Sequence, residues 1–350
     1  MPSLQSPPMS PPVIKSLDDI RAALQSLPAG DDAAAAKASG REPTLTKPPG
    51  SLGRLEELSQ WLCRWQGRHP PSMGAPKAQV FAGNHGVVAQ GVSAFPADVT
   101  AQMVANFEAG GAAINQLCQV FGVGFSIDAL SLDRPTGDFT EGPAMTEDEC
   151  VDAFVFGMGT VSDGMDVLCL GEMGIGNTTS AAALTMALFG GDAAHWTGSG
   201  TGVQGAQLEK KTAVVAKAAA LHGNNAPDPL QSLCRLGGRE LAAITGAVLA
   251  ARFRRVPVLL DGYVATAAAA ALEAARPGAL EHCRAGHVSA EPGHRRLLEK
   301  LDMVPILDLD MRLGEASGAV LAVAVLKAAT ACHSGMATFE DAAVSGKTGE

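Results

Sequence analysis

The sequence predicts an α/β fold in which a mostly parallel sheet is flanked by helices. Short apolar runs rich in β-forming residues alternate along the chain with longer segments of helical periodicity. This alternation is typical of a parallel sheet covered on both faces. Four of the expected strands end in polar or glycine-rich loops. Because such loops share one edge of a parallel sheet, we expect them to form a single ligand cleft there.

The composition indicates which partners to expect. The 350-residue chain is 47% hydrophobic and 18% charged, as in globular proteins, and its formal net charge is −10. An acidic chain without a long Lys/Arg run is not expected to bind nucleic acid or an anionic membrane surface. No apolar run reaches the roughly 18 residues that a membrane span needs. We therefore expect small-molecule partners, no nucleic acid and no membrane.

The cysteines and histidines give no pattern of a metal or disulfide framework. The seven Cys are odd in number and scattered, without a C-x-x-C pair, which predicts buried thiols in a reducing cytoplasm. The eight His show no H-x-x-x-H or H-x-H spacing. We predict no protein-bound metal and no cofactor.

The N-terminal segments are expected to be a leader followed by helices. Residues 1–15 are Pro/Ser-rich without an apolar core, which predicts a disordered leader and not a signal peptide. Ser16 is placed to cap a first helix. The Ala/Gly/Asp-rich residues 29–43 are expected to be a loop, and Ser51 to cap a second helix after a rigid Lys-Pro-Pro-Gly turn.

The next expected elements end in a polar loop. A strand over 78–82 leads into Gly83, Asn84 and His85. Polar residues at a strand end lie where α/β sheets bind ligands, although His85 could equally cap its own loop. A broken helix is expected over 97–121. The later elements are an irregular stretch over 122–150, a helix starting near Thr146 within it, helices over 241–252 and 264–275, strands over 256–260 and 304–309, and a helix from about 318 to 330.

A strand, a glycine loop and a helix start follow one another over 166–205. The apolar run 167–170 predicts a buried strand, the glycines after it a loop, and the Asn-Thr-Thr at 177–179 a helix N-terminus. Bare backbone N–H groups and the helix dipole make this an anion site. Either glycine loop alone could be a flexible connection, but two together favour phosphate binding. The candidate residues are Glu172, Gly174, Gly176, Asn177, Thr178, Gly200 and Gly202.

Three charged residues in or near these loops have open roles. Lys211 is either a solvated helix residue or the cation that completes the anion site. Glu172 would repel phosphate, so we expect it to bind hydroxyls or backbone N–H groups. Glu315 is either a first-turn carboxylate that complements the helix dipole or a general base. Other nucleotide fingerprints are absent, since Gly171–Asn177 is not G-x-G-x-x-G and no Walker A motif occurs.

With these loops assembled, the chain resembles the nicotinate-nucleotide–dimethylbenzimidazole phosphoribosyltransferases, which make the lower-ligand nucleotide of cobalamin. The likeness runs from about Leu45 to Met336. It rests on seven blocks in order, namely KPPGSLGRLE, AGNHGV with GVSAFP, GEMGIGNTTSAAA, GGRELAAITG, PVLLDG, HVSAEPGH and MRLGEASGA.

The resemblance implies a Rossmann-like core and a homodimer. It implies a small helical domain from residues 16–75 and 331–350, beside a catalytic α/β domain over 76–330. The substrates would be nicotinate mononucleotide and a benzimidazole base, with no cofactor. Glu315 would be the catalytic base. The implied substrate-binding residues are Glu172, Gly174, Gly176, Asn177, Thr178, Gly200, Gly202, Lys211, Asn84, His85, Ser289, Leu313 and Gly314.

Two departures from the family pattern and two alternative functions stay open at this point. Asn84 stands where the family commonly has Asp, and the segment 131–141 differs from the usual family stretch. The alternatives are a nucleotide-binding sensor or carrier without turnover, and a phosphoribosyltransferase with a different acceptor base.

Overall fold

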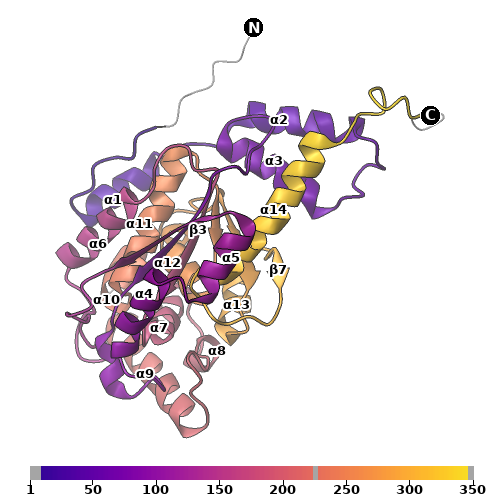
Figure 1. The fold of residues 1–350 in the computed structure, drawn as a ribbon. Coiled ribbons are helices and arrows are strands. Elements are labelled where there is room, and N and C mark those ends of the chain that lie inside the picture. Colours follow the sequence, from indigo (N-terminus) through magenta and orange to yellow (C-terminus); the bar gives the residue numbers. More distant parts are fainter. Residues whose placement is uncertain (1–8, 224–227, 346–350) are drawn as a thin grey trace.

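The computed structural model describes residues 9–223 and 228–345, in which helices enclose a central sheet (Figure 1). Within these residues the main sheet has five strands in the order β2-β1-β3-β4-β5, and every pairing is parallel. The predicted α/β class is therefore confirmed. The order is a doubly wound one whose direction reverses between β1 and β3, the position where such sheets bind ligands.

The strands β2, β1 and β3 on one side of the main sheet are longer than β4 and β5 on the other. A small second sheet pairs β6 with β7. The strands are β1 Pro76–Ala82, β2 Gly124–Ala129, β3 Val167–Met173, β4 Val258–Leu260, β5 Cys283–Ala285, β6 His287–Val288 and β7 Leu307–Asp308.

The helices connect the strands and cover both faces of the sheet. The α-helices are α1 Leu17–Gln25, α2 Asp32–Arg41, α3 Arg54–Gln66, α4 Asp98–Glu108, α5 Ala113–Phe121, α6 Glu147–Gly159, α7 Asn177–Phe189, α8 Ala193–Trp196, α9 Ala206–Gly223, α10 Pro229–Leu236, α11 Arg239–Arg254, α12 Tyr263–Ala275, α13 Pro292–Lys300 and α14 Ser317–Gly335. Two short 3-10 helices are η1 Glu42–Thr44 and η2 Gly86–Gln90.

The core lies in two layers, one on each face of the sheet. Along β3, Leu168 and Leu170 pack in the cluster that contains α6, α7, α11 and α12. Val167 and Cys169 point the other way, into the cluster that contains α3, α5 and α14. Because successive residues of a strand alternate between faces, a strand covered on both sides is apolar throughout. This explains the continuous apolar run at 167–170.

The segment nearest the N-terminus differs from the predicted disordered leader. Met9 donates its N–H to the carbonyl of Phe253, and Ile14 is buried in the core cluster of the sheet. Residues 1–8 lie outside the described part of the chain. The helix after Ser16 is confirmed, because the Ser16 side chain accepts the Asp19 N–H as its N-cap.

The terminal helices project from the body of the molecule in Figure 1, where α2 and α3 lie beside the end of α14. Leu45 forms a β-bridge with Thr338, which ties the N-terminal segment to the C-terminal one. By contrast, α1 packs in the cluster of the main sheet. The division into domains at 16–75, 76–330 and 331–350 stays a prediction.

Some predicted elements are wrong for identifiable reasons. The expected loop over 29–43 contains α2, whose N-cap Asp31 and alanines favour a helix. The expected irregular stretch over 122–150 contains the edge strand β2. Ser51 is not the cap of α3, which begins at Arg54.

One described helix, α14, is long and apolar enough to cross a membrane by length and composition. Its buried face, however, contacts α3, α5 and β3. These contacts are those of a core helix in a globular fold.

Candidate active site

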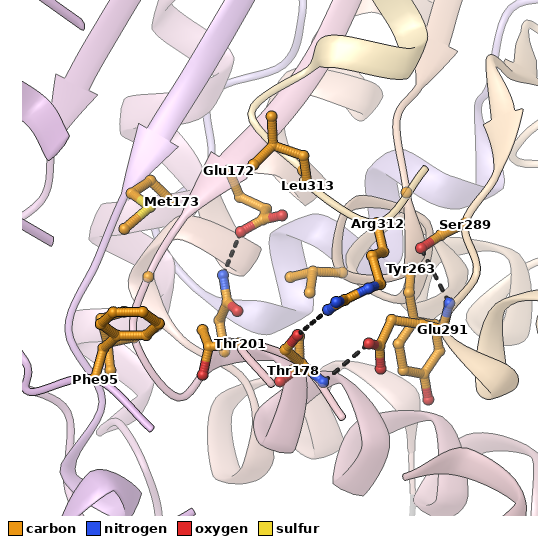
Figure 2. A pocket seen from close by; sticks show the side chains of 17 residues that line it. Phe95, Glu172, Met173, Thr178, Thr201, Tyr263, Ser289, Glu291, Arg312 and Leu313 are labelled. Atoms are coloured by element: carbon orange, nitrogen blue, oxygen red, sulfur yellow. Dashed lines mark hydrogen bonds between the residues drawn. The ribbon is translucent and has the colours of Figure 1, made fainter. Parts of the chain in front are cut away.

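A cavity of about 490 Å³ opens where β3 and β4 end, at the edge of the sheet that the loops share (Figure 2). Figure 2 shows Phe95 and Met173 at one end of the cavity and Ser289, Tyr263 and Glu291 at the other. The lining is formed by Phe95, Glu172, Met173, Gly174, Ile175, Asn177, Thr178, Gly200, Thr201, Gly262, Tyr263, Val264, Ser289, Glu291, Arg312, Leu313 and Gly314.

The predicted strand–loop–helix unit forms one wall. The strand β3 runs on to Met173, and α7 begins at Asn177 after a left-handed Gly176 at φ 96°. Asn177 donates its side-chain amide to Glu172, so the loop is closed by a bond between two of the predicted residues. Hydroxyls or backbone N–H groups were expected as the partners of Glu172, and the partner in the structure is instead a side-chain amide.

The glycine run and Lys211 lie together beside α7. The Lys211 ammonium donates to Thr178 Oγ1 at 2.8 Å and to the Gly198 carbonyl at 2.9 Å. Its side chain is only 1% exposed, so the interpretation of a solvated helix residue is wrong. Burial lowers the pKa of Lys211 to about 8. Lys211 therefore lies one layer behind the lining residues Thr178 and Gly200.

The cation that faces the cavity is Arg312, which the sequence analysis missed. Arg312 is exposed and donates from Nη1 to the Gly200 carbonyl at 3.1 Å. Glu291, also missed, accepts the Gly200 N–H on Oε1 at 2.9 Å, while its buried Oε2 has no partner among the described residues. Arg312 stands three residues before Glu315 in the same glycine-containing motif, and that proximity was the signal available in the sequence.

Glu315 lies in a strained turn directly before α14. Glu315 and Ala316 both have φ 63°, a left-handed conformation that residues with a Cβ rarely adopt. The Glu315 N–H donates to the carbonyl of Glu172 at 3.2 Å. Its side chain is 5% exposed and does not line the cavity among the described residues, whereas Gly314 and Glu172 do.

Carboxyl groups gather at this edge and raise one another's pKa. Burial raises the pKa of Glu172 to about 8, with contributions from the charges of Asp261, Glu240 and Glu315. Burial and the charge of Asp261 raise the pKa of Glu315 to about 7. Two carboxyls with pKa values near neutrality beside a cavity are typical of acid–base sites. In the described part of the chain, no group of three or more His, Cys, Asp or Glu side chains is placed to hold a metal ion.

Asn84 and His85 are placed away from the cavity lining. Asn84 donates its side-chain amide to the Leu132 carbonyl at 2.9 Å, and its backbone carbonyl accepts the Thr136 N–H. His85 Nε2 lies 2.5 Å from Glu240, and both side chains are fully buried. The two departures from the family pattern thus contact each other, because Asn84 anchors the segment 131–141.

The cavity brings together most of the predicted substrate-binding residues but not all of them. Those in its lining are Glu172, Gly174, Asn177, Thr178, Gly200, Ser289, Leu313 and Gly314. Those outside it are Gly176, Gly202, Lys211, Asn84, His85 and Glu315.

The chain is similar to known phosphoribosyltransferases over most of its length. A phosphoribosyltransferase family model, DBI_PRT, matches residues 27–344. The chain is 58% identical over 330 residues to the nicotinate-nucleotide–dimethylbenzimidazole phosphoribosyltransferase of Sinorhizobium medicae, covering 94% of this chain and 97% of that protein. The enzyme of the same name from Rhizobium meliloti matches at the same identity and coverage.

A solved structure of this family also has the same fold. The crystal structure of a nicotinate-nucleotide–dimethylbenzimidazole phosphoribosyltransferase from Thermus thermophilus superposes with a TM-score of 0.84 at 41% identity, over 91% of this chain and 100% of that one. The resemblance inferred from the seven sequence blocks is confirmed. The chain belongs to the nicotinate-nucleotide–dimethylbenzimidazole phosphoribosyltransferase family.

Proposed function

We propose that this protein transfers the 5-phosphoribosyl group of nicotinate mononucleotide to 5,6-dimethylbenzimidazole. The products are α-ribazole 5′-phosphate and nicotinate, and the step belongs to cobalamin biosynthesis. The near full-length likeness to enzymes of that name supports this activity. The cavity supports it further. The N-terminus of α7, which favours anions, lines this cavity close to two carboxyls with raised pKa.

The catalytic base in this proposal is Glu315. The observation that carries the assignment is the place of Glu315 in a buried left-handed turn whose N–H bonds to the Glu172 carbonyl. Burial and the charge of Asp261 raise the pKa of Glu315 to about 7 there. A base whose pKa lies near the working pH is the most effective one.

The reaction needs a base more than an acid. The bond from ribosyl C1 to the pyridinium nitrogen breaks, and this discharges the cation, so nicotinate leaves without being protonated. The benzimidazole N–H proton passes to Glu315 while the opposite ring nitrogen forms the new bond to C1. Attack from the face opposite the leaving group turns a β-nucleotide into an α-nucleotide.

The 5′-phosphate is proposed to bind between the start of α7 and Arg312. The first N–H groups of a helix favour an anion, and Arg312 supplies a positive charge at the cavity. Lys211 supports this site from behind, because its ammonium holds Thr178 and the glycine run in place. Glu291, whose Oε2 has no hydrogen-bond partner in the described part of the chain, suits a ribose hydroxyl better than a phosphate.

The test is to incubate the purified protein with nicotinate mononucleotide and 5,6-dimethylbenzimidazole and to follow the products by chromatography. Nicotinate release matched by an α-riboside phosphate is expected. Binding without release would favour the sensor or carrier, and release only with another base would favour the different acceptor. Absence of binding would overturn the proposed activity.

A second candidate for the base is Glu172, because it lines the cavity and Glu315 does not. Glu315→Gln and Glu172→Gln separate the two. The proposal expects kcat to fall by roughly 10²–10⁴-fold in Glu315→Gln, the usual contribution of a general base. If only Glu172→Gln has this effect, Glu172 is the base.

The homodimer and the cytoplasmic location are also part of the proposal. All seven cysteines are free thiols in the structure, and six of them are buried, which supports a reducing compartment. Measurement of the mass in solution tests the homodimer.

A further inference from the structure

The turn that carries Glu315 is held in its strained conformation by several neighbouring groups. Two successive left-handed residues with a Cβ are strained and persist only where the surroundings fix them. On one side the turn is pressed against β3, since a Cβ on Gly171 would lie 2.0 Å from the Ala316 nitrogen. Ser317 closes it further by donating its hydroxyl to the Gly314 carbonyl at 2.7 Å.

The opposite side of the turn is held by Asp261, at the end of β4. Asp261 Oδ1 accepts the Ala319 N–H at 2.9 Å, which lies in the first turn of α14. A carboxylate at this position satisfies an orphan N–H and complements the helix dipole. Asp261 is 1% exposed and is absent from the cavity lining among the described residues, while the backbone N–H of the turn residue Ala316 is one of the groups that act on its carboxylate.

The carboxylate of Asp261 is retained although part of it has no partner. Its Oδ2 is buried without a hydrogen bond in the described residues, and the ring nitrogen His287 Nε2 lies 3.5 Å from Oδ1. A buried and incompletely paired charge lowers stability. Burial raises the pKa of Asp261, whereas the charge of His287 and the backbone N–H groups of Ala319, Gly318 and Ala316 act in the opposite direction and favour the carboxylate.

From this geometry we propose that Asp261 is a positioning residue for Glu315, which fixes the left-handed turn from the side of β4 and places a second carboxyl near the base. The inference rests on the proposed role of Glu315. It assigns Asp261 two separable effects, one through a hydrogen bond and one through charge.

The electrostatic effect is specific to the pair because few other charges face Glu315. In the described part of the chain these are Glu172 on β3 and Asp261 itself, with His287 beyond Asp261 and Glu240 beyond Glu172. The charge of Asp261 is the one that raises the pKa of Glu315. Removal of this charge lowers that pKa.

Two substitutions separate the two effects. Asp261→Asn keeps an oxygen for the Ala319 N–H but removes the charge, so the acid limb of the kcat/KM profile is expected to move to lower pH while most of the kcat remains. Asp261→Ala removes the hydrogen bond too, and kcat is expected to fall on the order of 10²-fold, the loss that follows from a misplaced catalytic group. KM for nicotinate mononucleotide is expected to change little in both variants.

Ser16→Ala is the control, because it removes a helix N-cap of the same chemistry at α1, away from the cavity. Its thermal stability should fall while kcat and the pH profile stay the same. An unchanged acid limb in Asp261→Asn overturns the charge effect, and a kcat in Asp261→Ala equal to that of the parent overturns the positioning effect. If Asp261→Ala does not fold, the pH profile of Asp261→Asn decides alone.

The variant Glu315→Gln, measured alongside, distinguishes a failure of the proposed base from a failure of the role proposed for Asp261. If Glu315→Gln retains the parent kcat, the proposed base is wrong whatever Asp261 does. If Glu315→Gln is inactive while both Asp261 variants behave like the parent enzyme, only the role of Asp261 is overturned.

Discussion

The N–H of Glu315 donates to the carbonyl oxygen of Glu172 at 3.2 Å, and this bond joins the two carboxyl-bearing segments of the site. Glu172 ends β3 and Glu315 precedes α14, so residues far apart in the sequence are held at a fixed spacing. The charge of Glu315 then helps to raise the pKa of Glu172. The activity and stability of the protein should therefore both depend on pH near neutrality.

The pH dependence of activity follows from the pKa of Glu315, about 7. A general base acts only when it is deprotonated, so kcat/KM is expected to rise with pH and to level off above about pH 7. A profile measured from about pH 5.5 to about pH 9 brackets this pKa and checks the expectation. If the acid limb instead persists unchanged in the residual activity of Glu315→Gln, another group is responsible for it.

The pH dependence of stability has the opposite sign. The pKa of Glu172 is about 8 in the folded protein and near 4.5 in the unfolded chain, so the folded state binds the extra proton between these values. Stability is then greatest below about pH 4.5 as far as this group is concerned, and is lost as the pH rises through about 8. The free energy of unfolding, measured in urea at about pH 6 and about pH 8.5, should fall more in the parent than in Glu172→Gln.

Other titrating groups also change the free energy of unfolding with pH, so the test is the comparison between the parent and its variants. Glu209→Gln, at an exposed position on α9, is the matched control and should keep the slope of the parent. A Glu172→Gln variant with that same slope would show that Glu172 is ionised in the folded protein.

Substitutions of Arg312 and Lys211 are expected to differ in their effects on stability, although both should raise KM. Arg312→Ala removes a cation at the cavity and should raise KM for nicotinate mononucleotide by about tenfold or more with little effect on stability, since hydrogen bonds to charged groups contribute about 1.5–3 kcal/mol. Lys211→Met should raise KM and also lower stability, because Thr178 and the Gly198 carbonyl lose their buried donor.

Arg295→Ala is a suitable control, because its exposed ion pair with Asp308 lies outside the cavity lining. It should leave KM unchanged, since exposed pairs contribute little. A KM unaffected by both Arg312→Ala and Lys211→Met would place the phosphate elsewhere in the cavity.

Elements that are long or carry their own capping residue could be predicted from the sequence. The apolar run of β3, the glycine loop after it and the Ser16 cap were predicted and are present. The strands β5 and β6 contain only two or three residues each, too few to show a period of two, and neither is among the expected strands, whereas β7 lies inside the strand expected over 304–309.

The part of the site that lies at the ends of strands could be predicted from the sequence. The end of β3 and the loop before α14 place Glu172 and Gly314 at one edge of the sheet, as expected. The direction of a side chain depends on tertiary contacts, which a single sequence does not contain. For this reason Lys211 was expected in the cavity and lies behind it, while Arg312 and Glu291 were missed.

The close contact between α6 and α11 gives a prediction about stability. A Cβ on Gly157 of α6 would lie 1.9 Å from the Ala243 carbonyl oxygen of α11, and a Cβ on Gly246 would lie 1.9 Å from the Phe154 oxygen. These glycines let the two backbones approach directly. Gly157→Ala forces the helices apart and should lower the free energy of unfolding by about 1–3 kcal/mol, the usual range for overpacking.

The matched control lies two residues further along the same helix. A Cβ on Gly159 would meet nothing within 4 Å, so Gly159→Ala adds only helix propensity and should raise stability by at most about 1 kcal/mol. Urea unfolding of both variants measures the difference. Opposite signs are expected because the same chemical change meets backbone at Gly157 and open space at Gly159, and equal effects would show that the α6–α11 contact is looser than the structure has it.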